Sequence, residues 1–189
     1  MSRLRLRTVV ADTSALVSLA VPRADPGYDT ESSPDPLQYL LTSCDVSVPP
    51  EVTRELGDMT QYQDIHGAAA TNVLAARDHY TVTDPYNEDD PLESRPTFGL
   101  DAGETDSIVL ANALEVDGFL TDEFGGTNFP LIHAVLQGPR IVPTPRLICD
   151  YARNGHMAHN EALTLLTSIG PHRSWEDSPY VAQLRQRLE

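Results

Sequence analysis

Acidic residues stand where apolar segments end and where helical segments begin. Asp12 follows the apolar run TVVA, and Asp122 and Glu123 follow FLT. Glu55 and Asp106 lie in the first turns of segments with helical character. Because the carboxyl ends of parallel strands meet at one edge of a sheet, we expect these carboxylates to converge there.

Carboxylates that lie close together repel one another and raise each other's pKa unless a cation neutralises them. Oxygen ligands without His or Cys favour Mg²⁺ or Mn²⁺. Such an ion activates a water molecule and stabilises the charge that develops when a phosphodiester is attacked in line. The pattern therefore predicts a divalent-metal site for phosphodiester hydrolysis, with four ligands: Asp12, Glu55, Asp106 and Asp122.

Two of these acids have structural alternatives. Asp12 could serve only to cap the helix that begins beside Thr13 and Ser14. Glu51 lies four residues before Glu55 on the same helical face, and competes with it for the ligand position. Glu51 stands in the first turn, where its charge suits the helix dipole, so we expect Glu55 to be the ligand.

In the block LDAGETDSIVLANALE, two neighbouring acids also compete for a ligand position, Glu104 and Asp106. Asp101 and Glu104 have the spacing of a capping box, which gives both a structural role. Glu104 and Asp106 are two residues apart and do not face the same way on a helix. Asp106 shares its face with apolar residues, an unfavourable place for a carboxylate without a partner. We therefore expect Asp106 to be a ligand and Glu104 to support it.

Strand-like and helix-like segments alternate through most of the chain, which predicts an α/β fold with a mostly parallel sheet of four or five strands. We expect a single domain over 1–189, with a core over 8–143 and a helical extension over 144–189. Two stretches rich in Pro and Asp, 22–36 and 84–99, are expected to be loops. The strand-like segments are 8–12, 45–49, 80–83, 118–123 and 139–143. The helix-like segments are 14–21, 36–44, 50–56 with a continuation over 59–77, 104–116, 130–136, 144–155, 159–170 and 177–188.

The charge is strongly negative: 28 acidic residues stand against 13 basic ones, all of them Arg, for a net charge of −15. Such a surface argues against a nucleic-acid partner, unless the protein works in concentrated salt that screens its charge. The absence of Lys resembles a haloarchaeal composition, so we favour adaptation to salt. With two cysteines, no signal-peptide pattern and no membrane span in the sequence, we expect a cytoplasmic protein without disulfides.

Four pieces of the chain, VVADTSALVSL, VPPEVTREL, LDAGETDSIVLANALE and FLTDE, resemble the PIN family in this order. The helical tail beyond residue 144 is similar to a PIN subfamily as well. PIN domains are small three-layer α/β/α nucleases that use Mg²⁺ or Mn²⁺, and many are toxins of toxin–antitoxin pairs, the VapC-like proteins. The resemblance departs from the family at the loops 22–36 and 84–99, and at Asn128, where some toxins have a further acid.

The resemblance implies an endoribonuclease that leaves a 5′-phosphate and a 3′-hydroxyl. It assigns the four predicted ligands as the catalytic residues, with Ser14, Glu104 and Glu123 in support. It also implies a homodimer and an antitoxin partner. The alternatives are a non-catalytic PIN-like module that binds RNA or protein, and a hydrolase of another phosphodiester.

Two further expectations concern partners. Arg54 beside Glu55 is the candidate for contact with RNA phosphates, although each Arg could instead pair with one of the many acids. Three other arginines, Arg23, Arg95 and Arg146, are placed where they could line the approach to the site. The helical tail offers apolar residues for a dimer interface: Leu147, Ile148, Leu163, Leu166 and Trp175.

Overall fold

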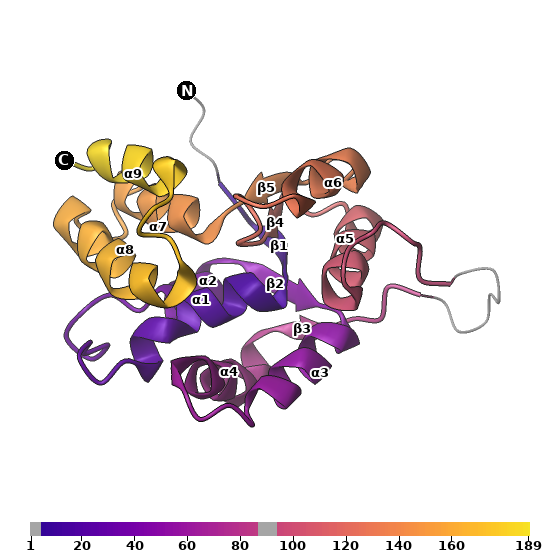
Figure 1. Cartoon of the computed structure of the whole chain (residues 1–189), viewed down its shortest axis with the longest axis horizontal. Helices are drawn as coiled ribbons and strands as arrows, with labels where there is room; N and C mark the ends of the chain where they lie inside the picture. Colours follow the sequence, from indigo (N-terminus) through magenta and orange to yellow (C-terminus); the bar gives the residue numbers. More distant parts are fainter. Residues whose placement is uncertain (1–4, 87–93) are drawn as a thin grey trace.

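The computed structural model describes residues 5–86 and 94–189. Its strands form one five-stranded sheet in the order β3-β2-β1-β4-β5, and every pair of neighbours is parallel (Figure 1). The predicted α/β class is confirmed, and the sheet is parallel throughout. The strands are β1 (Thr8–Ala11), β2 (Asp45–Val48), β3 (Thr81–Val82), β4 (Gly118–Leu120) and β5 (Arg140–Val142).

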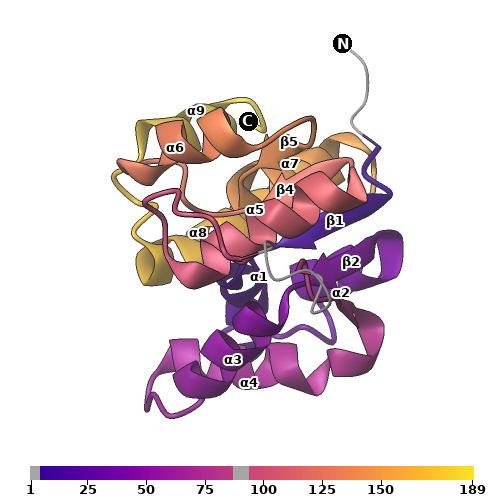
Figure 2. The same cartoon turned by 90° about the vertical axis from the view of Figure 1, so that its right-hand side faces the viewer.

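Helices connect the strands and cover both faces of the sheet (Figures 1 and 2). Their positions agree with the segments expected from the sequence, apart from differences in α1, α3 and α4. The helices are α1 (Thr13–Ala24), α2 (Pro36–Ser43), α3 (Pro50–Met59), α4 (Ile65–Ala75), α5 (Ala102–Leu114), α6 (Asn128–Val135), α7 (Thr144–Arg153), α8 (His159–Arg173) and α9 (Pro179–Gln186), with a short 3₁₀ helix at Arg77–His79.

The first helix runs further than expected, because α1 continues through Pro22 to Ala24. Proline lacks an N–H and removes one bond of the helix ladder. The last turn still closes, since the N–H of Asp25 donates to the carbonyl of Val21 at 3.0 Å. The expected loop therefore begins three residues later than the composition of 22–36 suggests.

The helix expected to continue past residue 57 is divided into α3 and α4. Asp64 caps α4 by accepting hydrogen bonds from the N–H groups of His66 and Gly67. Gly67 lies against the carbonyl of Tyr62 so closely that a Cβ at this position would overlap it. The cap at Asp64 and the close contact at Gly67 accompany the start of a second helix, where the spacing of apolar residues predicts a single continuous one.

Alternate residues of β1 point to opposite faces of the sheet, as strand geometry requires. Val9 and Ala11 belong to the larger core, which the sheet shares with α1, α4, α7 and α8. Val10 belongs to a smaller core on the other face, with Ile108 of α5 and Ile132 of α6. Figure 2 views the molecule from the α5 side, with α5 in front of the strands. The sheet thus lies between two helical layers.

The strand order reverses beside β1. The chain passes from β1 to β2 and β3 on one side, then returns to place β4 and β5 on the other. In open parallel sheets, ligands bind outside the carboxyl ends of the strands at such a switch point. Here that point lies between the ends of β1 and β4, where Asp12 and the Thr121–Glu123 segment emerge.

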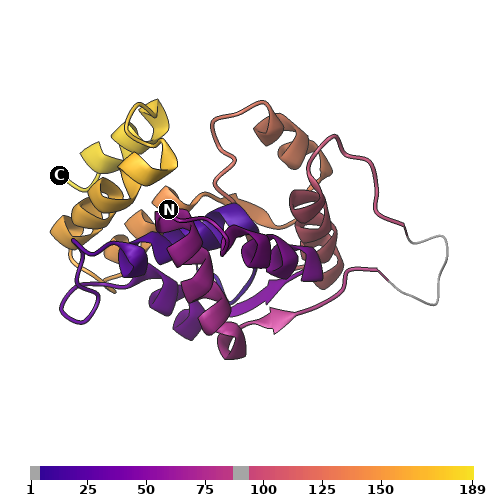
Figure 3. The same cartoon turned by 60° about the horizontal axis from the view of Figure 1, so that its bottom comes forward.

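The C-terminal helices α7, α8 and α9 pack together at the end of the molecule away from α5 and α6 (Figure 3). The apolar residues named for a dimer interface are used inside the chain: Leu147, Ile148, Leu166 and Trp175 are buried, and Leu163 packs against the same core. That surface argument for a dimer is therefore wrong, while the homodimer itself stays a prediction. Within the described ranges, none of the helices is long and apolar enough to cross a membrane.

Candidate functional site

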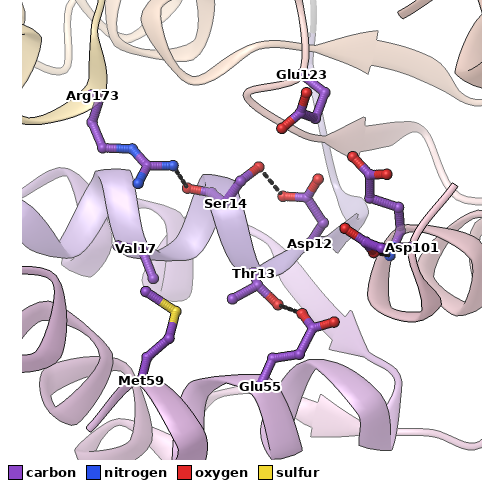
Figure 4. Close-up of a pocket in the computed structure, with 10 residues that line it drawn as sticks. Asp12, Thr13, Ser14, Val17, Glu55, Met59, Asp101, Glu123 and Arg173 are labelled. Atoms are coloured by element: carbon purple, nitrogen blue, oxygen red, sulfur yellow. Dashed lines mark hydrogen bonds between the residues drawn. The ribbon is translucent and has the colours of Figure 1, made fainter. Parts of the chain in front are cut away.

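A pocket of about 260 Å³ opens at the carboxyl edge of the sheet, at the switch point (Figure 4). Five carboxylates and one guanidinium stand among its lining residues. The carboxylates come from segments that follow β1, β2, β3 and β4, so distant parts of the chain contribute to one site. The lining residues are Asp12, Thr13, Ser14, Val17, Glu55, Met59, Asp101, Glu104, Glu123 and Arg173.

Asp12 stands at the centre of this arrangement, directly after β1 and at the N-cap of α1. Its Oδ1 accepts hydrogen bonds from the Ala15 N–H at 2.8 Å and from the Ser14 hydroxyl at 2.7 Å. Its Oδ2 is buried and makes no hydrogen bond of ordinary geometry in the described part of the chain, although the Thr121 hydroxyl lies near enough to the carboxyl group to lower its pKa. Burial raises the pKa of Asp12 to about 7. Asp12 therefore caps α1 through Oδ1, as the structural alternative predicts, and its second oxygen, Oδ2, takes no part in capping.

Glu104 and Asp101 reach the pocket from the start of α5. Asp101 caps the helix by accepting the Glu104 N–H at 2.7 Å, as the sequence predicts. Glu104 is buried as a residue, with 6% of its surface exposed, and its carboxylate accepts a hydrogen bond from Asn128 at 3.4 Å. Burial, reinforced by the negative charges of Asp101, Asp12 and Glu123, raises the pKa of Glu104 to about 7.

Glu55 enters the pocket from α3, where it accepts a hydrogen bond from the Thr13 hydroxyl (Figure 4). Burial raises the pKa of its carboxyl group above the usual value. The carboxylate lies directly against Gly103 in the first turn of α5, and a Cβ on Gly103 would overlap it. Gly103 is thus needed here for space, since its backbone conformation is open to other residues. No residue pattern around Gly103 predicts this contact.

Asp106, predicted as a ligand, is held away from the pocket by the 84–99 segment. Arg95 donates to both of its carboxylate oxygens at 2.8 Å, and the Tyr86 hydroxyl donates to Oδ1 at 2.6 Å. Arg95 also lies 3.6 Å from a carboxylate oxygen of Glu51. Asp106 and Glu51 therefore anchor the ends of the loop whose central residues, 87–93, lie outside the described ranges.

Asp122, the fourth predicted ligand, is partly buried beside the pocket and engaged by other groups. It accepts hydrogen bonds from the Ser18 hydroxyl and from the Thr144 N–H, the latter at 3.0 Å. Its own N–H donates to the Ser14 hydroxyl at 3.1 Å. These contacts join the end of β4 to α1 and to the start of α7, and leave the next residue, Glu123, lining the pocket.

The arginines proposed to contact RNA are paired with acids. Arg54 donates to Glu51 and Asp58 on its own helix, and does not line the pocket. Arg23 pairs with Asp35, Arg95 with Asp106, and Arg146 with Asp150. The cation that does line the pocket, Arg173, was not singled out, because its position at the end of α8 depends on how the C-terminal helices fold back.

The carboxylates line one pocket, but their present spacing does not form a set of metal ligands. In the described ranges, no three His, Cys, Asp or Glu side chains lie close enough together to hold one metal ion as they stand. The donor chemistry nevertheless fits Mg²⁺ or Mn²⁺, because all the donors are oxygens and Asp12 Oδ2 is a buried acceptor without a partner. The long side chains of Glu104 and Glu123 could reach such an ion by rotation.

Comparisons of the chain with protein-family models, with curated proteins and with solved structures find no match. The interpretation of the pocket therefore depends on its own geometry and on the motif resemblance.

Proposed function

We propose that the chain is a metal-dependent endoribonuclease of the PIN type, which hydrolyses RNA phosphodiester bonds with Mg²⁺ or Mn²⁺. The observation that carries the proposal is the unpartnered, buried Oδ2 of Asp12, which stands at the end of the central strand in a pocket with four further carboxylates. A buried acceptor without a donor is unfavourable unless a ligand satisfies it. RNA as substrate is what the motif resemblance implies.

In this proposal Asp12 and Glu104 bind the ion directly, while Asp101, Glu123 and Glu55 line the same pocket. A bound divalent ion would supply Lewis-acid stabilisation of the phosphate and would activate a water molecule. Because the Ser14 hydroxyl donates to Asp12 and accepts from the Asp122 N–H, Ser14 fixes the orientation of Asp12. Glu55 is oriented in the same way by the Thr13 hydroxyl.

This ligand set differs from the one predicted from sequence at two positions. Asp106 is paired with Arg95, and Asp122 accepts hydrogen bonds from Ser18 and Thr144, so both carboxylates are already engaged by other groups. Glu104 and Glu123 line the pocket at the corresponding segments. We therefore propose Glu104 in place of Asp106, with Asp122 as a residue that positions the end of β4.

The proposal is tested by incubating the chain with single-stranded RNA and with DNA of the same sequence, in molar KCl with Mn²⁺, Mg²⁺ or EDTA. We expect internal cleavage of RNA with either ion, products with 5′-phosphate and 3′-hydroxyl ends, and no cleavage in EDTA. Cleavage of DNA alone would contradict the assigned substrate. RNA binding without metal-dependent cleavage would point to the non-catalytic module and overturn the proposal.

A further inference from the structure

Arg173 is the single positively charged residue among those that line the carboxylate pocket. It is the last residue of α8 and approaches the pocket from the C-terminal extension, on the opposite side from Glu55 (Figure 4). In the described ranges its guanidinium forms no ion pair, unlike Arg23, Arg54 and Arg95. The chain has more than twice as many acidic as basic residues, so most arginines can find an acidic partner. An arginine that lies beside five carboxylates without forming an ion pair therefore suggests a role other than pairing with an acid.

The stem of Arg173 is held in place by its neighbours. One guanidinium nitrogen donates to the carbonyl of Ser14 at 3.3 Å, and Nε is buried without a partner. The preceding carbonyl, of His172, is bonded to His66 of α4 at 2.9 Å. Beyond Arg173 the chain turns sharply, with Ser174 in the left-handed region at φ 57° and the Trp175 N–H bonded to the Gly170 carbonyl. The guanidinium is therefore positioned before any ligand arrives.

A second pocket, of about 410 Å³, begins where the first one ends. The two pockets share Arg173 and Glu123, and the second is also lined by Phe124, Gly125 and Trp175. Arg173 thus lies at the boundary between them. A polymeric substrate whose reacting bond lies in the first pocket must leave it in some direction, and the second pocket, which Asp122 and Asp177 also line, adjoins the first at Arg173 and Glu123.

We propose that Arg173 binds a backbone phosphate of the RNA next to the scissile bond, and directs the strand from the carboxylate pocket into the second pocket. This inference rests on the proposed nuclease function. The five carboxylates repel a polyanion, and a bound divalent ion offsets that repulsion only at the scissile position. Arg173 supplies the positive charge that the adjacent phosphate needs, and its fork can bind two phosphate oxygens.

The test compares Arg173→Ala and Arg173→Lys with Arg185→Ala. Arg185 is a matched control, because it also donates to a helix carbonyl, that of Leu166 at 3.1 Å, and also has a buried Nε without a partner. It lines neither pocket. Steady-state RNA cleavage is measured over a series of KCl concentrations, together with Mn²⁺ affinity and the melting temperature.

For Arg173→Ala we expect KM to rise roughly tenfold with a smaller change in kcat, since a contact to a neighbouring phosphate contributes to binding throughout the reaction. The slope of log(kcat/KM) against log[KCl] should become shallower by about 0.7, the value for one phosphate contact to a single strand. Arg173→Lys should recover part of the KM. Mn²⁺ affinity should stay as in the parent, and Arg185→Ala should match the parent in KM and in salt slope.

If the parent cleaves RNA and Arg173→Ala has the same KM and salt slope, this inference is overturned and the nuclease proposal stands. An equal rise of KM in Arg185→Ala would assign Arg173 to helix packing alone and would also overturn it. If the parent neither binds nor cleaves RNA, both proposals fail together.

Discussion

The variant Asp12→Asn is expected to lose metal-dependent RNA cleavage while keeping its fold. The substitution replaces Oδ2 of Asp12, a buried carboxylate oxygen without a hydrogen-bond partner in the described residues, with an amide nitrogen that cannot bind a cation. Loss of several kcal/mol of charge stabilisation in the transition state corresponds to roughly a thousandfold or larger decrease in kcat. Cleavage of a labelled RNA in Mn²⁺, followed over time at saturating enzyme, measures this directly.

The fold should tolerate this change because Asn is also a good N-cap, and its side-chain oxygen can still accept the bonds from Ala15 and Ser14. Burial raises the pKa of Asp12 from its ordinary value of 3.8 to about 7, so ionising this carboxyl group costs the folded state stability relative to the unfolded state, and the cost grows from about pH 4 and is complete above about pH 7. The melting temperature above pH 7 should therefore equal or exceed that of the parent.

A matched control is Asp117→Asn. Asp117 accepts hydrogen bonds from the N–H groups of Arg7 and Thr8 at the opposite edge of the same sheet. This variant should retain cleavage within a few-fold of the parent. Cleavage by Asp12→Asn at the parent's rate would rule Asp12 out as a metal ligand.

The second large effect concerns salt. The net charge of −15 makes the folded chain repel itself, and the pocket concentrates five of its carboxylates in one place. The distance over which charges act falls from about 10 Å at 0.1 M salt to about 3 Å at 1 M. We expect the melting temperature to be roughly 10 °C higher in molar KCl than in dilute buffer, which corresponds to about 3 kcal/mol for a chain of this size.

Salt also strengthens apolar burial, and this contribution must be separated from screening. Sucrose stabilises proteins without screening charge. The sucrose and KCl concentrations are first matched so that both raise the melting temperature of an uncharged reference protein equally. At these concentrations sucrose should raise the melting temperature of this chain far less than KCl does. Thermal melts followed by circular dichroism provide both series. Equal midpoints in dilute buffer and molar KCl would contradict the interpretation of the composition as an adaptation to salt.

The sequence predicted the α/β class, the parallel sheet and the position of Asp12 at a strand end, because these depend on local signals. The alternation of apolar strands with helical segments favours a parallel sheet, and Asp12 follows the strand that proves to be central. Strand ends in a parallel sheet share one edge whatever the details of packing. Asp12, Ser14, Glu55, Glu104 and Glu123 of the predicted residues all line the resulting pocket.

The choice between Glu104 and Asp106 could not be made from sequence. Helical periodicity shows that the two carboxylates point in different directions, but which one faces the site depends on how α5 is rotated against the sheet. That rotation is set by packing, with Ile108 buried against the strands. The partner of Asp106 is Arg95, which lies eleven residues earlier in the chain. Neither the rotation of α5 nor the pairing of Arg95 with Asp106 can be predicted from the spacing of apolar residues in the sequence.

Asp122 and Arg173 were unpredictable for a related reason. The strand was predicted over 118–123 and ends at Leu120, and the Thr144 N–H that engages Asp122 belongs to a helix twenty-two residues later. Arg173 reaches the pocket only because α8 packs along α1, where it donates to the Ser14 carbonyl. Contacts between segments far apart in the sequence decide which charged groups are compensated and which remain open to a ligand.

The most direct measurement of the central claim is Mn²⁺ binding to the chain and to three variants, by isothermal titration calorimetry in molar KCl. The account predicts that the parent binds Mn²⁺, that Asp12→Asn and Glu104→Gln lose most of the affinity, and that Asp106→Asn binds as the parent does. Absence of Mn²⁺ binding by the folded parent would contradict the account. So would loss of binding in Asp106→Asn with full binding in Glu104→Gln, because the site would then lie outside this pocket.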